Sequence, residues 1–205
     1  MSPLLEDYIR KNYPNYKLTS STCKRITDPE KVCQEVEKDY HIVVIDYDLN
    51  HDFETLEKIP DKSKCEILVN ACCNPDCAHR SHHYEIIGLE QIAYANHVRK
   101  YPNAPFDQEK FNSEHTDAAY EFNCDCMRRS LFKVKDLSCH ITPDEIWEKY
   151  VPMGFNQFKI EGRTSDIFNL AEHYLYYMAK PECLDEARLI FYRNLWKNNV
   201  ISVNN

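Results

Sequence analysis

Hydrophobic and polar positions along the chain follow two spacings in alternation, one typical of strands and one typical of helices. Four segments are predicted strands, over 16–22, 41–47, 65–71 and 155–162, and the β-branched centre of 41–47 is typical of a strand buried on both faces. Apolar residues at helical spacing predict helices over 3–12, 53–59, 84–100, 165–180 and 184–198, and Ile86, Ile87, Ile92 and Val98 form the apolar stripe of the third of these. A capping residue before a proline predicts two more helices, beginning near Asp28 and Thr142.

This order of strand and helix determines the expected fold class. Strands that alternate with helices join through right-handed crossovers into a parallel sheet. We therefore expect a single α/β domain over residues 1–205, built as a parallel (β/α) half-barrel or partial TIM-type barrel with about four parallel strands and covering helices. A long loop at about 101–140 interrupts the pattern, and its cysteines suggest a functional loop.

Composition and charge narrow the class of function. Hydrophobic residues make up 43% of the chain and charged residues 28%, which is an ordinary globular balance. The net charge of -8 gives no broad positive field, so tight nucleic-acid binding is not expected. No apolar run is long enough to cross a bilayer, and the acidic residues of 1–10 do not fit a signal peptide, so we expect a cytoplasmic protein. The three glycines are too few and too dispersed for a phosphate-binding loop, which argues against a nucleotide-loop enzyme.

The ten cysteines point to metal binding more than to disulfides, because a reducing compartment keeps thiols free. Cys73 and Cys77 follow the third predicted strand, with Pro75 turning the chain between them. The ends of parallel strands gather ligands at one edge of a sheet, and thiolates favour iron–sulfur clusters or zinc. His79, His82 and His83 follow closely, and because zinc also accepts histidine ligands, zinc is an alternative metal. The alternative is that these are ordinary reduced thiols.

Further ligands are expected from other loops. The long loop carries Cys124 and Cys126, which are separated by one residue. Two thiols at this spacing often cannot both bind one ion, and we favour Cys126 as the ligand. Cys23 follows the first strand and is the candidate fourth ligand, with Cys139 as another candidate. The remaining cysteines in helix or strand positions are expected to be core residues: Cys33, Cys65 and Cys183.

A second group of candidates lies at the ends of the strands. Lys159, Glu161 and Arg163 share one face of the last strand, because side chains alternate along a strand. Such charges are costly when buried unless they are paired or used, so they are either a substrate-binding and catalytic set or a self-satisfied ion network. Polar residues that end the other strands are candidate cofactor- or ligand-binding residues, Asn70 and Asp46 foremost, with Ser21, Thr22 and Asp48 beside them.

The end of the chain resembles the collagenase-like peptidase family. The resemblance lies in Asp136-Leu137-Ser138, the capped helix after it, Gly154-Phe155 and the element from Phe158 to Arg163, and it covers roughly residues 65 to 195. It implies a (β/α) barrel, a four-cysteine iron–sulfur site, and oxygen-independent hydroxylation of RNA or of a quinone precursor, with peptidase activity as a historical assignment. Within it, Cys73 and Cys77 match cluster ligands and Cys126 matches more loosely, although the cysteine spacing and the glycine- and arginine-rich surroundings of the family differ.

Four strands are half of a barrel, and an open half-barrel exposes sheet edges. We therefore expect a homodimer or a separate chain that supplies the other half. The leading functional hypothesis is an iron–sulfur protein that acts on a small carboxylate or a modified base. A zinc-stabilised binding or structural module is the alternative. A peptidase ranks third, because no serine or cysteine nucleophile with a spaced histidine base stands out.

Overall fold

A four-stranded, all-parallel sheet forms the centre of the chain, as the sequence predicts. The computed structural model describes residues 3–115, 126, 129–162 and 166–202. The strands are β1 (Thr19–Ser20), β2 (Ile42–Ile45), β3 (Cys65–Leu68) and β4 (Gln157–Lys159), in the order β1-β2-β3-β4. Val44 pairs with Glu66, and Glu66 pairs with Gln157. Sequential, parallel neighbours with helical connections are the arrangement of a partial (β/α) barrel.

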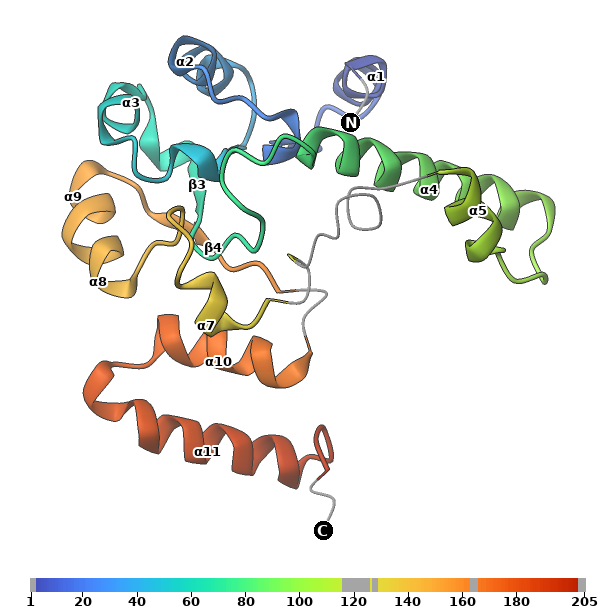
Figure 1. Cartoon of the computed structure of the whole chain (residues 1–205). Coiled ribbons are helices and arrows are strands. Elements are labelled where there is room, and N and C mark those ends of the chain that lie inside the picture. The colour runs from blue at the N-terminus through green and yellow to red at the C-terminus, as the bar shows by residue number, and fades with distance from the viewer. Residues whose placement is uncertain (1–2, 116–125, 127–128, 163–165, 203–205) are drawn as a thin grey trace.

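Helices surround the sheet, and the arrangement can be followed in Figure 1. The helices α2, α3, α8 and α9 lie along one side of the sheet, α10 and α11 form a pair below it, and α4 with α5 projects away from the body. Their bounds are α1 (Pro3–Asn12), α2 (Pro29–Glu37), α3 (Phe53–Lys58), α4 (Arg80–Lys100), α5 (Gln108–Glu114), α7 (Leu131–Val134), α8 (Pro143–Glu145), α9 (Val151–Met153), α10 (Ile167–Met178) and α11 (Leu184–Lys197). A π-helical segment, Ile146–Tyr150, joins α8 to α9.

The strands are shorter than the segments that predict them, and in β1 and β2 the reason is a capped turn that follows the strand directly. Ser21 accepts a hydrogen bond from the Cys23 amide and begins the 3₁₀ turn Thr22–Lys24. Asp46 accepts from the Asp48 amide and begins the turn Tyr47–Leu49. Short polar side chains at such positions satisfy backbone donors that a strand would leave free. The chain therefore leaves the sheet early and places polar groups at its C-terminal edge.

The main hydrophobic core lies between the sheet and its covering helices. It includes Val43, Ile45 and Ile67 of the sheet and, from the helices, Val36 and Leu56. The helix start predicted at Asp28 is confirmed, since its carboxylate accepts from the Lys31 amide. The capping box predicted at Thr142 is also present. These apolar side chains are buried on one side of the sheet. Because side chains alternate along a strand, the residues between them point to the other side of the sheet.

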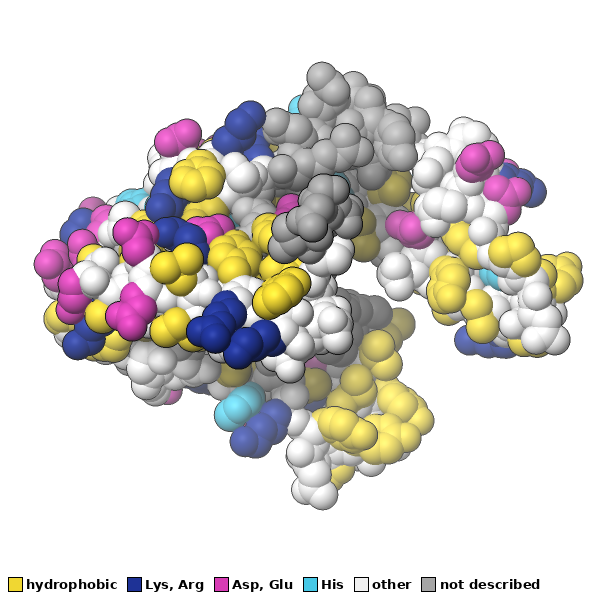
Figure 2. All heavy atoms as spheres, turned by 90° about the horizontal axis from the view of Figure 1, so that it is seen from below, with side chains coloured by type: hydrophobic (Ala, Val, Ile, Leu, Met, Phe, Trp, Pro, Cys, Tyr) yellow, Lys and Arg dark blue, Asp and Glu magenta, His cyan; other side chains and the backbone are white. Residues whose placement is uncertain are grey.

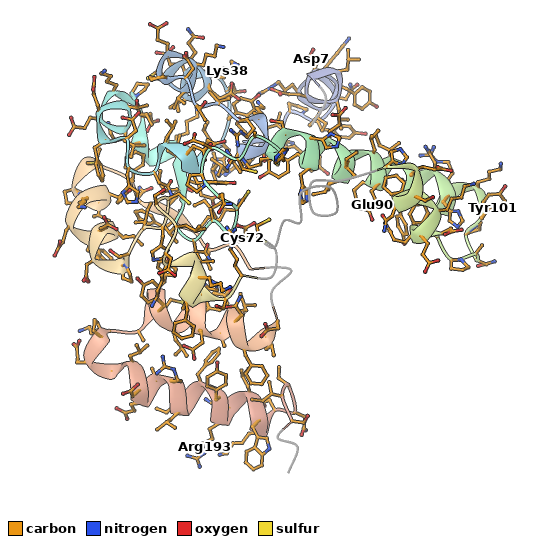
Figure 3. All side chains as sticks on the ribbon, viewed as in Figure 1. Asp7, Lys38, Cys72, Glu90, Tyr101 and Arg193 are labelled. Carbon is orange, nitrogen blue, oxygen red and sulfur yellow. The ribbon has the colours of Figure 1, made fainter. Side chains whose placement is uncertain are left out.

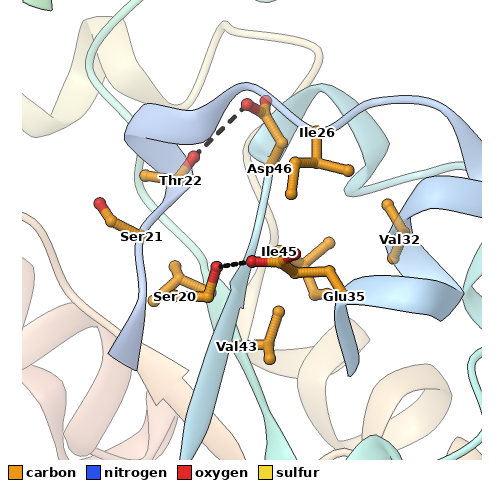
Figure 4. A pocket seen from close by; sticks show the side chains of 10 residues that line it. Ser20, Ser21, Thr22, Ile26, Val32, Glu35, Val43, Ile45 and Asp46 are labelled. Atoms are coloured by element: carbon orange, nitrogen blue, oxygen red, sulfur yellow. Dashed lines mark hydrogen bonds between the residues drawn. The ribbon is translucent and has the colours of Figure 1, made fainter. Parts of the chain in front are cut away.

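One carboxylate is buried within this core. Ser20, Lys24 and Lys38 all bond to Glu35, at 2.5–2.6 Å. Burial opposes its ionisation, but these hydrogen bonds outweigh the burial and lower the pKa of Glu35 to about 2. The neighbouring cavity has a volume of about 10 Å³, the size of one water molecule (Figure 4). It is too small for a substrate, so this part of the sheet has a structural role.

The helix α4 departs from the predicted pattern. It begins one turn earlier than predicted, at Arg80, and of its apolar stripe only Ile86 is buried. Ile92 and Val98 are 60% and 39% exposed, because α4 leaves the body and contacts α5 instead of the sheet. Figure 2 shows hydrophobic side chains gathered on this projecting arm. Among the described residues, no helix has the length and apolar character needed to cross a membrane.

Candidate functional site

The loop that follows β3 carries the predicted cysteine cluster over the C-terminal edge of the sheet. Its start is held between two neighbours, because the Val69 amide donates to the Lys159 carbonyl and the Val69 carbonyl accepts from the Ile141 amide, both at 3.0 Å. Figure 3 shows Cys72 in the middle of the molecule, between the sheet and α7. Loops from β3, β4 and the segment before α8 therefore meet at one place.

Three of the predicted metal ligands interact within this place. The Cys73 thiol lies close enough to Cys126 and to Cys77 for both to affect its pKa. The Cys126 thiol and burial together raise the pKa of Cys73, and burial raises the pKa of Cys77. Two sequence-distant loops thus bring Cys73 and Cys126 near each other at the end of the central strands.

The two candidate fourth ligands lie in different surroundings. Cys139 is buried and packs with Cys73, Leu68 and Ala71 in a small hydrophobic cluster. Asn50 holds it there by donating to the carbonyls of Cys139 and Leu68, at 2.7 and 2.9 Å. Cys23, in contrast, is exposed and lines a cleft of about 340 Å³ beside the edge strand β1. Of the two, Cys139 is therefore the one in contact with the cysteine cluster.

The charged residues of the last strand are used in different ways. Lys159 forms an ion pair of 3.0 Å with Glu66 on the neighbouring strand β3. Glu161 accepts a hydrogen bond of 3.1 Å from the Cys72 amide through its carboxylate. Arg163 lies outside the described residues. Of these two residues, Glu161 contacts the cysteine loop directly, whereas Lys159 is paired within the sheet.

Asn70 connects three elements beneath the site. Its amide donates to the Glu161 carbonyl at 2.8 Å, accepts from the Glu161 amide at 2.6 Å and lies 3.0 Å from Nδ1 of His173 on α10. Asn70 is 1% exposed and His173 is 2% exposed, and burial lowers the pKa of His173. All of these contacts are within the chain, so Asn70 fixes the relative position of β3, β4 and α10.

Asp46 belongs to a buried ion cluster that the sequence does not reveal. Arg80 Nη2 lies 2.7 Å from Asp46 and 2.9 Å from Asp48, while Arg25 lies 3.2 Å from Asp48. The Asp76 amide also donates to Asp48 at 3.1 Å, which ties the cysteine loop to the ion cluster. Arg25 and Asp76 both have positive φ values, 55° and 52°, and such strain is typical of functional sites.

The donor set fits a soft metal or an iron–sulfur cluster in its chemistry, since thiolates are the ligands that both prefer. Cys73 interacts with Cys77 and with Cys126, and Cys139 packs beside Cys73. Within the part of the chain that the structure describes, however, no three Cys, His, Asp or Glu side chains already form a closed metal-binding group. Cys124 lies outside the described residues. A bound centre would therefore draw these thiols into a tighter arrangement than the one they hold.

Comparisons with known proteins do not assign the chain to a family. No protein-family model matches the sequence, and neither a curated protein nor a solved structure matches it. The fold and the contacts described above are therefore the basis for any functional proposal, and the resemblance to the collagenase-like peptidase family stays a hypothesis.

Proposed function

We propose that the protein binds an iron–sulfur cluster through Cys73, Cys77 and Cys126, with Cys139 or Cys23 as a further ligand. The observation that carries this proposal is the interaction of Cys73 with Cys77 in the same loop and with Cys126, which lies far away in the sequence. Cysteines that gather at the C-terminal edge of a parallel sheet occupy the position at which such folds bind ligands.

The proposed activity is an oxygen-independent hydroxylation or a related modification, as the family resemblance implies. A bound cluster supplies electron transfer. The chain's own residues would hold a small carboxylate or a modified base along the face that carries Lys159 and Glu161. Glu161 lies next to the cysteine loop and can orient a donor group of the substrate. Lys159 can release Glu66 and bind an anionic group, because its ion pair is partly exposed to solvent.

Anaerobic reconstitution tests the cluster. We expect purified chain to take up iron and sulfide and to show sulfur-to-iron charge-transfer absorbance. Cys73→Ser and Cys77→Ser should lose most of the iron, while Cys183→Ser, at an exposed cysteine before α11, should retain it. Colourless wild-type protein without iron after reconstitution would refute the proposal.

A zinc-stabilised binding or structural module is the second candidate, because zinc accepts sulfur and histidine ligands together. The observation that favours it is the position of His79, which directly precedes α4 and lies two residues after Cys77. Metal analysis of freshly purified protein decides between the two. Zinc without iron, at one ion per chain and lost together with Cys77, would favour this candidate.

A partner that completes the barrel is part of the proposal. The sheet ends in two outer strands, β1 and β4, and the arm of α4 carries exposed apolar residues such as Ile92 and Tyr94. Outer strands and apolar surface of this kind are normally covered. We expect a homodimer or a complex with a chain that provides the other half-barrel. Light scattering of the purified chain tests the homodimer, and a monomer at high concentration would contradict it.

A further inference from the structure

The guanidinium of Arg80 is buried, yet most of it has no hydrogen-bond partner. Arg80 is 3% exposed. Its Nη2 atom donates to Asp46 and Asp48, at 2.7 and 2.9 Å, and these two bonds use both hydrogens of that atom. Nε and Nη1 are fully enclosed and have no acceptor among the described residues. Buried arginine donors without partners are costly, so an acceptor from outside the described side chains is expected.

The surroundings of Arg80 indicate which acceptor this is. The guanidinium lies 3.8 Å above the ring of Tyr47, which fixes the plane of its remaining donors. That same ring packs in one hydrophobic cluster with Cys139 and, at its margin, Cys73. The Arg80 amide also donates to the Cys77 carbonyl at 3.2 Å, so Arg80 is connected to the end of the cysteine loop by a backbone hydrogen bond. Arg80 therefore contacts the tyrosine ring that packs with Cys139 and Cys73, and its backbone directly follows the cysteine loop.

We propose that Arg80 donates hydrogen bonds from Nε and Nη1 to the sulfur atoms of the centre bound by Cys73, Cys77 and Cys126. This inference rests on the proposed function. Arg80 is a positioning residue in this proposal: Asp46 and Asp48 hold its Nη2 edge, and Tyr47, which packs with Cys139 and Cys73, holds its plane. Hydrogen bonds and positive charge near the sulfurs stabilise the more negative, reduced form of an iron–sulfur cluster.

The reduction potential of the reconstituted cluster tests the proposal, because a purely structural role of Arg80 would leave it unchanged. The double variant Arg80→Met/Asp46→Asn removes the donors and removes one charge of each sign, so the net local charge is unchanged. An asparagine at position 46 can still accept a hydrogen bond from the Asp48 amide, and Asp48 keeps its ion pair with Arg25. Arg99→Met is the matched control, since Arg99 is an exposed arginine near the other end of α4.

We expect the double variant to have a lower midpoint potential than the wild type, measured by reductive titration followed by electron paramagnetic resonance. Arg80→Lys, which keeps a cation and is the milder change for folding, should shift the potential in the same direction by a smaller amount. Arg99→Met should match the wild type. Iron and sulfide content, measured on the same samples, shows that each variant carries the same cluster.

The outcomes separate the two proposals. If the wild type takes up a cluster and both Arg80 variants have its potential, the role of Arg80 is refuted while the cluster proposal stands. If the wild type takes up no iron or sulfide, both are refuted. A lower potential in both Arg80 variants, with Arg99→Met unchanged, supports the hydrogen bonds to sulfur.

Discussion

Replacing Asn70 by alanine tests whether the site rests on the connection between β3, β4 and α10. The substitution removes the side-chain amide that bonds to the Glu161 backbone twice, at 2.6 and 2.8 Å, and to His173 at 3.0 Å. Asn70 is 1% exposed, so water does not readily replace these bonds. Alanine therefore leaves a backbone donor, a backbone acceptor and an imidazole nitrogen unpaired in the interior.

The magnitude follows from these three groups. Each buried group left without a partner costs about 1–3 kcal/mol. The loss for all three groups is smaller than the sum of the separate costs, because the surrounding structure relaxes in part. We expect a loss of about 4 kcal/mol in the free energy of unfolding. For a chain of 205 residues this corresponds to a fall in Tm of about 10 °C. Because typical domains have only about 5–15 kcal/mol in total, the change is large.

Urea denaturation followed by circular dichroism measures the change, with Asn194→Ala on the exposed side of α11 as the control. The control should change the unfolding free energy by less than about 0.5 kcal/mol. A loss below about 1 kcal/mol for Asn70→Ala would show that the three bonds do not hold the elements together. Reconstituted iron per chain should fall in the same variant, since Glu161 also accepts from the Cys72 amide.

Three further predictions concern single side chains. Glu35 has a pKa of about 2 in the folded chain against 4.5 unfolded, so its stabilisation is present above pH 4.5 and is lost as the pH falls toward 2. Glu35→Gln should lose about 2 kcal/mol at pH 7 and show a flatter pH dependence in that window; an unchanged acid titration of stability would contradict this. Lys159→Ala should change the unfolding free energy by less than about 1 kcal/mol in urea melts, because its pair with Glu66 is partly exposed, and should leave the iron content unchanged. Gly154→Ala should cost about 1–2 kcal/mol, since Gly154 has a φ of 105°; a Tm equal to that of the wild type would refute it.

The sequence predicts the fold well where local pattern and burial agree. The run around Val43 and Val44 and the caps at Asp28 and Thr142 are local signals, and the structure confirms the elements they predict. The meeting of Cys73 with Cys126 could also be predicted, because loops after parallel strands converge at one edge of a sheet.

Other features depend on distances that a linear pattern does not contain. The pair between Lys159 and Glu66 depends on the register of β3 and β4. The ion cluster of Arg80 depends on where the loop after β2 ends, although an arginine three residues after Cys77 is a signal that could have drawn attention. The apolar stripe of α4 shows that the helix is amphipathic, but not that its neighbour is α5 instead of the sheet.

Strand order in this sheet equals chain order, and this has a consequence for folding during synthesis. Each new strand can add to the edge of the strand made just before it, so β1, β2 and β3 assemble from nearby contacts. The last strand is different, because its pairing with β3 joins residues 66 and 157. The cysteine loop therefore leaves the ribosome long before Cys139 and Glu161 arrive to enclose it. A nascent chain stalled before β4 should expose reactive thiols that the finished chain protects.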